Sequence, residues 1–321
     1  MKCLICENKN VTFLSDYKLE IEDDVEYFKN CKIYKCSDCD FNFVNPMPSK
    51  EKLDYFYENI YRSLNRPPYW FTENFEDIKN SYLEDRNIGY LMYTSLLLDF
   101  KQISNIFDFG AGPGDLGFVL KKKYPHLKLF CTENDKHCAT LLEERGYTNL
   151  KDINQLENKI DLITTLHSLE HLDSLNIFEN FRKILKSKGR IFFEVPNCPK
   201  EYFDGRPYDG PHLLFFTKKS FEKIAKKYNF EIEHFHFSSY TFQQDHKYQK
   251  ESQDLYYRLN NRNINFEKVK KKIKKIIPYK LIKLRQKLNH ASKLTASNRI
   301  DNFAFNTGDN CYIRGILRKL D

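Results

Sequence analysis

The chain has 321 residues, of which 41% are hydrophobic and 15% are aromatic, and its formal net charge is +8. This length holds one domain of ordinary size plus appendages, and the apolar fraction supplies a sizeable core. No apolar run approaches the length of a transmembrane helix, and the first residues lack the apolar stretch of a signal peptide, so we expect neither a membrane-spanning nor an exported protein.

Nine cysteines are scattered along the chain. Their number is odd, and no export signal accompanies them. A cytoplasmic protein with reduced thiols is therefore a better interpretation than a disulfide framework.

The amino-terminal region contains two Cys-x-x-Cys pairs, Cys3 with Cys6 and Cys36 with Cys39. Each pair can chelate a metal from one tight turn, and four thiolates complete the tetrahedral shell of a structural zinc ion. Metal binding would supply the folding energy that so small a segment lacks. Two unrelated thiol pairs, or a redox motif, are the alternatives, and Cys31 lies near enough to compete as a ligand. The spacing favours a zinc ribbon with a structural or docking role.

Proline-containing segments separate this region from the rest of the chain. Residues 45–49 read Asn-Pro-Met-Pro-Ser, and proline cannot continue a strand ladder. Residues 51–61 have a helical pattern rich in aromatic side chains, and residues 75–100 read as one or two further helices. We therefore expect a zinc ribbon over residues 1–48 and a helical linker or cap over residues 49–100.

The stretch that begins at residue 106 predicts a nucleotide-binding turn. Residues 106–109 form a short apolar run typical of a buried strand, and three glycines then alternate with other residues at Gly110, Gly112 and Gly114. Residues 118–123 have a helical pattern. Glycines let the backbone approach a ligand closely, and the start of a helix offers free N–H groups.

Two features distinguish this turn from the dinucleotide fingerprint. The fingerprint has its third glycine three residues after the second, where this chain has Asp115, and here the third glycine comes one residue earlier. Asp108 precedes the first glycine by two residues, at the carboxyl end of the strand. A carboxylate there repels a pyrophosphate but suits a ligand that carries an ammonium group.

The next elements predict a parallel sheet. A strand over residues 127–132 ends at Glu133, and an acidic residue about twenty positions beyond such a turn can accept hydrogen bonds from both ribose hydroxyls. Strands that alternate with helices form right-handed crossovers, and their ligand binds at the carboxyl ends of the strands. Further strands are expected over residues 160–166 and 189–197, with a helix over residues 137–145.

The order Asp-x-Gly-x-Gly-x-Gly from Asp108 resembles motif I of class I S-adenosylmethionine (SAM)-dependent methyltransferases. The resemblance covers about residues 100 to 240 by motif. With the two cysteine pairs, it is specifically to the methyltransferases of surface-glycan and modified-sugar pathways that carry an amino-terminal zinc ribbon. It implies an α/β fold whose Rossmann-like sheet has seven strands, the last of them antiparallel, in a methyltransferase domain over residues 101–321.

The resemblance also implies which residues hold the cofactor. The glycine turn would hold the methionine end of SAM, Glu133 the ribose, and Asp152 with Ile153 the adenine. In sugar-modifying members a helical region before the sheet lies over the cofactor, so Tyr61 becomes a lining residue, with a core or interface role as the alternative. The implied set is Asp108, Gly110, Ala111, Gly112, Gly114, Leu116, Glu133, Asn134, Asp152, Ile153, His167 and Tyr61.

Two histidines are candidates for catalysis. His212 precedes Leu-Leu-Phe-Phe-Thr and an amphipathic helix, a pattern that resembles the loop of sugar C-methyltransferases in which a histidine acts as base. An imidazole suits this role because its usual pKa of about 6.5 lets it accept a proton near neutral pH. The alternative is that His212 only orients the loop. His167 follows the fourth strand and would face the methionine part of the cofactor, whereas His171 is expected to be structural.

The carboxyl-terminal region contains an insertion. Residues 230–237 and 311–318 read as the sixth and seventh strands, and we expect a basic helical insertion over residues 241–308. Residues 267–287 hold ten Lys or Arg and one Glu, so the positive charge of the chain is local. Four interpretations compete: a lid over an anionic substrate, attachment to acidic lipid, a nucleic-acid patch, and a solvated insert. The solvated insert is favoured for most of the lysines.

We therefore predict methyl transfer from SAM to a small anionic acceptor, a nucleotide-linked sugar or polysaccharide precursor, by direct displacement with histidine-assisted deprotonation. An RNA or protein methyltransferase that docks through the zinc ribbon and the basic insertion is one alternative, and a non-catalytic binding module is another. The fourth strand ends in Thr-Leu-His-Ser from Thr165, not in the Asn-Pro-Pro-Tyr-like tetrapeptide of amino-group methylation in nucleic acids. Nucleic acid is thus the less favoured partner.

Overall fold

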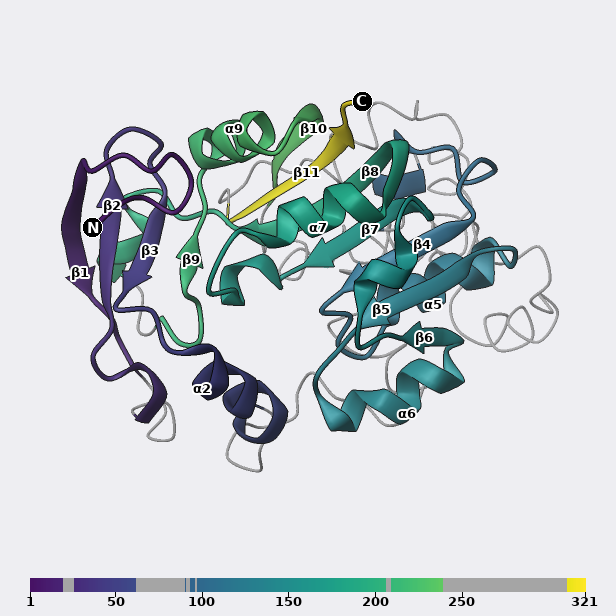
Figure 1. Ribbon diagram of the computed structural model, residues 1–321, viewed down its shortest axis with the longest axis horizontal. Coiled ribbons are helices and arrows are strands. Elements are labelled where there is room, and N and C mark those ends of the chain that lie inside the picture. Colours follow the sequence, from purple (N-terminus) through teal and green to yellow (C-terminus); the bar gives the residue numbers. More distant parts are fainter. Residues whose placement is uncertain (20–25, 62–89, 91–92, 96, 206–208, 239–310) are drawn as a thin grey trace, which may run out of the picture.

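A computed structural model describes residues 1–19, 26–61, 90, 93–95, 97–205, 209–238 and 311–321 (Figure 1). The expected insertion with its basic segment, and most of the helical pattern before residue 100, lie outside these residues, so the expectations for them stay predictions. The described part contains a small sheet and a large one. None of the described helices is long and apolar enough to cross a membrane.

The small sheet combines the amino-terminal region with a short strand from much later in the chain. Its four strands are antiparallel in the order β1-β2-β3-β9. β3 ends directly before Pro46, in line with the expectation that a proline ends the ladder. The strands are β1 Val11–Asp16, β2 Lys32–Cys36, β3 Asn42–Asn45 and β9 Leu214–Phe215.

The large sheet has seven strands in the order β10-β11-β8-β7-β4-β5-β6. The strands from β8 to β6 are parallel, whereas β11 runs antiparallel to both of its neighbours, β8 and β10. The prediction of a seven-stranded Rossmann-like sheet with an antiparallel last strand is therefore confirmed. The strands are β4 Asn105–Phe109, β5 Lys128–Thr132, β6 Tyr147–Asn149, β7 Ile160–Leu166, β8 Leu185–Pro196, β10 Phe230–Ser238 and β11 Tyr312–Lys319.

The helices that flank the large sheet are placed by apolar faces and caps. Phe178, Phe181 and Ile184 recur at helical spacing on α7 and are buried in the core. α9 begins after Thr217, whose side chain accepts a hydrogen bond from the N–H of Ser220. The helices are α5 Asp115–Lys123, α6 Lys136–Glu144, α7 Ile177–Ile184, α8 Tyr202–Gly205 and α9 Lys218–Lys227, with the 3₁₀ helices η2 Ile153–Leu156 and η3 Leu169–His171.

The helix expected over residues 51–61 has two parts. α2 spans Lys50–Tyr55 and begins after Ser49, whose side chain accepts a hydrogen bond from the N–H of Lys52. The chain then continues as a π-helix, η1, over Phe56–Ile60. Such wide turns are rare and are frequently found at functional sites.

The two sheets share one hydrophobic core. The ring of Phe41, just before β3, lies 5.5 Å from that of Phe216, just after β9, and Phe216 lies 5.2 Å from Phe221 on α9. The same core includes Ile33 of the small sheet and Phe193 of the large one. The amino-terminal region is therefore packed onto the rest of the molecule.

Candidate active site

The glycine turn between β4 and α5 has a backbone conformation that favours glycine. The φ angles of Gly110, Gly112 and Gly114 are 65°, 54° and 74°. A Cβ atom on Gly110 would lie 2.5 Å from Oγ of Ser168, which itself donates a hydrogen bond to the Gly110 carbonyl at 3.2 Å. The glycine turn and the residues that follow β7 are therefore in direct contact.

Asp108, on β4, is buried behind this turn. Thr164 donates a hydrogen bond to one carboxylate oxygen at 2.8 Å, and the Tyr147 hydroxyl donates one to the other at 3.0 Å. The same hydroxyl lies 3.2 Å from the carbonyl oxygen of Gly114. Burial raises the pKa of Asp108 to about 6, although both hydrogen bonds lower it. Asp108 is thus connected to the turn through Tyr147.

Glu133 lies beside the turn, just after β5. Its Oε2 accepts a hydrogen bond from the N–H of Gly112 at 2.6 Å, and its Oε1 accepts one from the N–H of Asp135 at 2.9 Å. β4 and β5 are parallel neighbours, with Phe109 opposite Thr132. The carboxylate and the turn therefore meet at the carboxyl edge of the sheet, where ligands of such folds bind.

The other predicted cofactor residues differ in their surroundings. Asp152, after β6, caps η2 by accepting hydrogen bonds from the backbone and side-chain nitrogens of Asn154. Leu116 is buried in the core at 3% exposure, and Asn134 is exposed. Ala111 and Ile153 are half-buried.

A second polar cluster follows β7, where η3 carries Glu170 and His171. The rings of His171 and His212 meet edge to face, with centroids 4.9 Å apart and an interplanar angle of 68°. One potential metal-ligand atom from each of Glu170, His171 and His212 lies within 4.8 Å of the others. The Tyr57 hydroxyl is 3.1 Å from Nδ1 of His171, and the Tyr61 ring lies 6.1 Å from the His171 ring. The structure thus brings His212 and Tyr61 together around His171, for which the sequence suggested a structural role only.

Glu170 is buried beside these imidazoles, at 1% exposure. Neither of its carboxylate oxygens accepts a hydrogen bond from the described residues, and Nδ1 of His167 lies 3.3 Å from Oε1 as an ion-pair contact. Burial raises the pKa of a carboxylate, but here His167, His171 and His212 outweigh it and lower the pKa of Glu170 to about 2. Glu170 is therefore a buried anion next to the histidines.

Burial has the opposite consequence for His212. It disfavours the charged imidazolium and lowers the pKa of His212 to about 3, a change that His171 adds to and Glu170 opposes. At neutral pH His212 is therefore an uncharged imidazole with a free lone pair, and its lowered pKa makes it a weaker base than an exposed histidine. The neighbouring Glu170 carboxylate is the group that would stabilise the positive charge of the protonated ring.

His167 connects this cluster to the large sheet. Its Nε2 lies 3.0 Å from Oε1 of Glu194 on β8. Glu194 also accepts hydrogen bonds from Tyr90 at 2.5 Å and from Arg314 at 2.6 Å. The imidazole of His167 is thus held between two buried carboxylates, those of Glu170 and Glu194.

Comparison with known sequences identifies the domain that contains these features. Residues 81–235 match a protein family described as a methyltransferase domain. The matched range includes the glycine turn, Glu133 and the cluster of Glu170, His171 and His212, together with the parallel strands β4 to β8 of the large sheet. The chain therefore contains a methyltransferase domain over residues 81–235. No curated protein sequence matches it.

Solved structures that resemble the methyltransferase do so weakly. A SAM-dependent methyltransferase from Archaeoglobus fulgidus is 15% identical, with 76% of this chain and 98% of that chain covered, at a TM-score of 0.43. The O-methyltransferase of a trans-AT PKS multienzyme from Brevibacillus brevis, in complex with S-adenosyl-L-homocysteine, is 14% identical, with 74% of each chain covered, at a TM-score of 0.38. Magnesium protoporphyrin IX methyltransferase from Synechocystis, with bound SAH, is 14% identical, with 59% and 92% covered, at a TM-score of 0.39. These similarities carry no argument about the acceptor.

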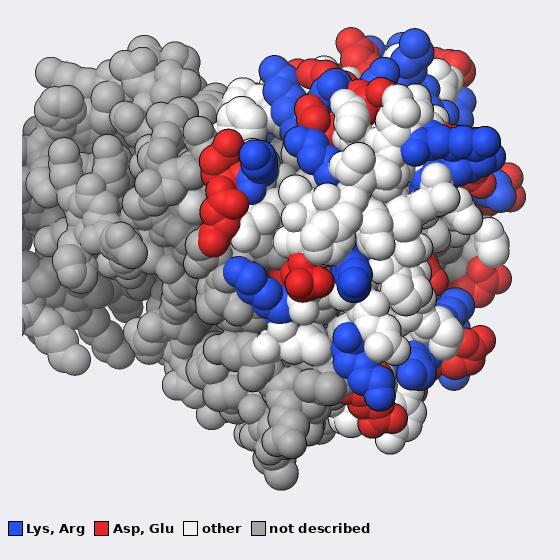
Figure 2. All heavy atoms as spheres, turned by 90° about the vertical axis from the view of Figure 1, so that its left-hand side faces the viewer, with Lys and Arg blue, Asp and Glu red and all other residues white. Residues whose placement is uncertain are grey.

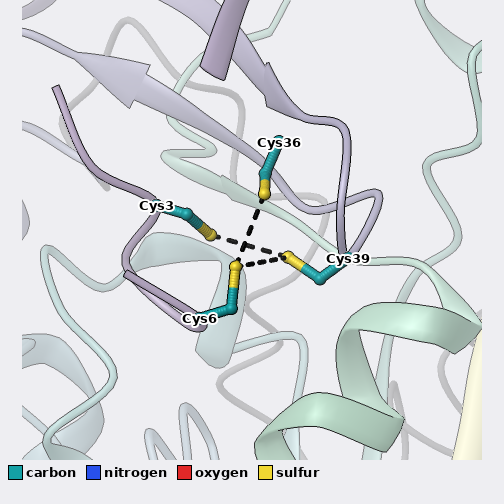
Figure 3. A group of neighbouring side chains, drawn as sticks. All are labelled: Cys3, Cys6, Cys36 and Cys39. Carbon is teal, nitrogen blue, oxygen red and sulfur yellow. Dashed lines mark hydrogen bonds between the residues drawn. The ribbon is translucent and has the colours of Figure 1, made fainter. Parts of the chain in front are cut away.

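The four paired cysteines of the methyltransferase converge at its amino-terminal end (Figure 3). Sγ of Cys3 lies 3.5 Å from Sγ of Cys39, and Sγ of Cys6 lies 3.5 Å from that of Cys36 and 3.8 Å from that of Cys39. A tetrahedral zinc ion with Zn–S bonds of about 2.3 Å needs sulfur atoms about 3.8 Å apart. The four thiols therefore fit a zinc ion.

Cys31, the competing ligand of the sequence analysis, lies outside this cluster. Its thiol donates a hydrogen bond to the carbonyl of Pro46 at 3.5 Å, and burial raises the pKa of Cys31 to about 11, which keeps the thiol protonated. All nine cysteines of the chain are free thiols.

Sequence analysis did not predict several residues that surround the histidines. Tyr57, Glu194 and Arg314 come from three distant segments, and no local pattern marks them. Glu170 did carry a signal, because it stands in a Leu-Glu-His-Leu pattern directly after a predicted strand. An acidic residue beside a histidine shortly after a buried strand is a candidate for the site.

Proposed function

We propose that the methyltransferase acts on a small molecule, a nucleotide-linked sugar or a surface-polysaccharide precursor, with His212 as the proton acceptor. The observation that carries this proposal is the uncharged His212, paired with His171 beside the buried anion Glu170. This cluster follows β7, two residues from Ser168, which contacts the glycine turn. These contacts connect the glycine turn with the segment that carries Glu170, and they support a common role for the turn and His212 in one reaction.

The cofactor would be held at the edge formed by β4, β5 and β6. When bound, SAM supplies a methyl group on a positively charged sulfur, and an acceptor atom displaces that sulfur in line. The glycine turn would receive the methionine end, with Asp108 supporting it through Tyr147. Glu133 would turn from the N–H of Gly112 to the ribose hydroxyls, and Asp152 would meet the adenine.

His212 would remove the proton of the acceptor as the new bond to the methyl group forms. The proton passes to a ring nitrogen of His212, and the imidazolium is stabilised by the carboxylate of Glu170. Tyr57 orients the second ring of the pair by its hydrogen bond with Nδ1 of His171. The protein therefore contributes positioning and proton removal.

A structural zinc ion at Cys3, Cys6, Cys36 and Cys39 is the second part of the proposal. The sulfur–sulfur distances of 3.5 to 3.8 Å support it. Four thiolates leave no open coordination position, so the ion would stabilise the small sheet without taking part in the chemistry.

The charge distribution supports a small acceptor over RNA or a protein. Figure 2 shows the face at the amino-terminal end, where Lys and Arg side chains are interspersed with Asp and Glu. Recognition of a nucleic acid needs a cluster of positive charge, and the described residues in this view form none. A macromolecular acceptor remains the second candidate, with the basic segment as its docking surface.

The test is release of S-adenosylhomocysteine in two parallel incubations of the full chain with SAM. One contains a panel of nucleotide-linked sugars and the other contains total RNA. We expect turnover with a sugar, and His212→Asn should lower its kcat by about 10²- to 10³-fold. Turnover with RNA alone would contradict the proposed acceptor.

A further inference from the structure

The segment that carries His212 belongs to the small sheet as well as to the methyltransferase domain. β9, which begins two residues after His212, is the fourth strand of the small sheet and pairs with β3 (Figure 1). The N–H of Val44 on β3 also donates a hydrogen bond to the carbonyl of Leu213 at 2.9 Å. From the other side, the N–H of Leu213 donates to the carbonyl of Glu170 at 2.7 Å. The backbone next to His212 is therefore bound by both parts of the molecule.

Contacts from the amino-terminal region also reach His212 and the residues before it. The Tyr17 hydroxyl donates a hydrogen bond to the carbonyl of His212 at 2.9 Å. The N–H of Lys18 donates to Oδ2 of Asp209 at 2.7 Å, and the N–H of Asp209 donates to the carbonyl of Lys18 at 2.8 Å. Asp209 is 1% exposed, so these bonds are shielded from water. Shielded bonds of this kind hold a loop in one conformation.

The second cysteine pair belongs to the same small sheet. Cys36 is the last residue of β2, and Cys39 lies in the turn between β2 and β3. This turn is tied by a hydrogen bond from the N–H of Asp40 to the carbonyl of Cys36 at 3.0 Å. The second cysteine pair therefore sits in the hairpin whose outer strand, β3, holds β9. A continuous path of bonded backbone runs from the thiols to His212.

We propose that the amino-terminal sheet is a positioning element for His212. The metal-closed hairpin and Tyr17 hold residues 209–216 so that the imidazole of His212 faces His171 and Glu170. This inference rests on the proposed function only in naming His212 as the proton acceptor, since the ordering of the segment does not depend on that role. Loss of the metal would then reduce methyl transfer while leaving cofactor affinity intact, because the glycine turn and Glu133 have their own supports in the large sheet.

The first experiment removes one metal ligand and measures hydrogen exchange by mass spectrometry without substrate. In Cys36→Ser, metal analysis should show loss of zinc, and residues 209–216 should exchange at least about tenfold faster, whereas residues 106–114 should exchange as in the wild type. Cys31→Ser is the matched control, because this buried thiol lies in the same region but outside the cluster. Unchanged exchange at residues 209–216 after loss of zinc, or equal acceleration at residues 106–114, would overturn the proposal.

The second experiment leaves the metal in place and removes one hydrogen bond. Tyr17→Phe keeps the ring against Phe28, 5.8 Å away, but loses the donor to the His212 carbonyl. We expect about fivefold faster hydrogen exchange at residues 209–216 and a lower kcat, with unchanged affinity for SAM. Tyr34→Phe on β2 is the control, and its exchange, kcat and SAM affinity should equal those of the wild type. If Tyr17→Phe exchanges like the wild type, the positioning role is wrong.

An absence of turnover in the wild type would count against the proposed function alone, because hydrogen exchange is measured without substrate.

Discussion

His212, which is half-buried, and Glu170, which is buried, belong to the same cluster. Desolvation and neighbouring charges leave His212 neutral and Glu170 ionised at neutral pH. The pKa of His212 falls to about 3 because burial disfavours its charged form, and the pKa of Glu170 falls to about 2 because three imidazoles outweigh the effect of burial. A neutral base beside a fixed anion is the arrangement that accepts a proton and then stabilises the charge. The predictions at the scale of residues follow from these two ionisation states.

Replacement of His212 should separate catalysis from cofactor binding. We expect His212→Asn to lower kcat by about 10²- to 10³-fold, because general-base catalysis is lost, while the SAM dissociation constant stays within about twofold of the wild type. Single-turnover methyl transfer and calorimetry measure the two quantities. His234→Asn on β10 is the control. An equal loss of activity in the control, or full activity in His212→Asn, would contradict the assignment.

The kcat of the wild type should not fall as the pH is lowered from 8 to 5. Because the pKa of His212 is lowered to about 3, the base form persists as the pH falls from 8 to 5, and kcat should stay constant with respect to this group. The rate should be measured at saturating SAM, because burial raises the pKa of Asp108 to about 6 and its protonation below that pH affects the cofactor edge. An acid limb with a midpoint near 6.5 would show that the imidazole titrates as an exposed histidine does.

At the scale of elements, the sequence predicted the strands and turns whose residues carry a local pattern. The apolar runs at β4, β5, β7 and β8 and the glycine turn are local signals, and their order alone implied parallel pairing. β9 has no such signal, since its two residues become a strand only by pairing with β3, more than 150 positions earlier. The π-helix after α2 could not be predicted either, because its sequence fits an ordinary α-helix.

The antiparallel strand β11 offers a test of how tightly the large sheet is packed. A Cβ atom on Gly315 would lie 2.6 Å from the carbonyl oxygen of His234 on β10 and 2.7 Å from the ring of Phe193 on β8. Gly315→Ala should therefore lower the free energy of unfolding by about 2 kcal/mol, since the backbone of β10 must shift. Denaturant unfolding measures this. Arg318→Ala, on the same strand, removes a half-buried side chain that ion-pairs with Glu231 and Glu233. It should cost less than about 1 kcal/mol, and equal effects would contradict the packing argument.

At the scale of the whole molecule, the amino-terminal region is bonded to the segment that carries His212, the proposed proton acceptor. The sequence predicted the cysteine set and His212 separately, each from its own motif, but it could not predict that β9 and Tyr17 connect them. Such contacts join residues almost 200 positions apart and leave no mark on local composition. The proposed cofactor residues carry local signals, because they follow consecutive strands of a recurrent fold, and their role stays a prediction.

Metal content tests the molecule as a whole. Native mass spectrometry of the purified chain should show one zinc ion, held by the four cysteines, and none in Cys6→Ser. Cys31→Ser should keep the ion. Two ions per chain would instead place a metal at Glu170, His171 and His212, and would contradict the role of His212 as a free base.

The most direct test of the account is calorimetric binding of S-adenosylhomocysteine to the wild type and to Glu133→Gln, with Glu143→Gln, exposed on α6, as the control. Glu133 accepts a hydrogen bond from the N–H of Gly112 in the glycine turn and is the proposed ribose-binding carboxylate. We predict one bound molecule per wild-type chain, unchanged affinity in the control, and about tenfold weaker binding in Glu133→Gln, because a charge-assisted hydrogen bond is lost. Equal affinity in all three proteins, or no binding to the wild type, would contradict the account.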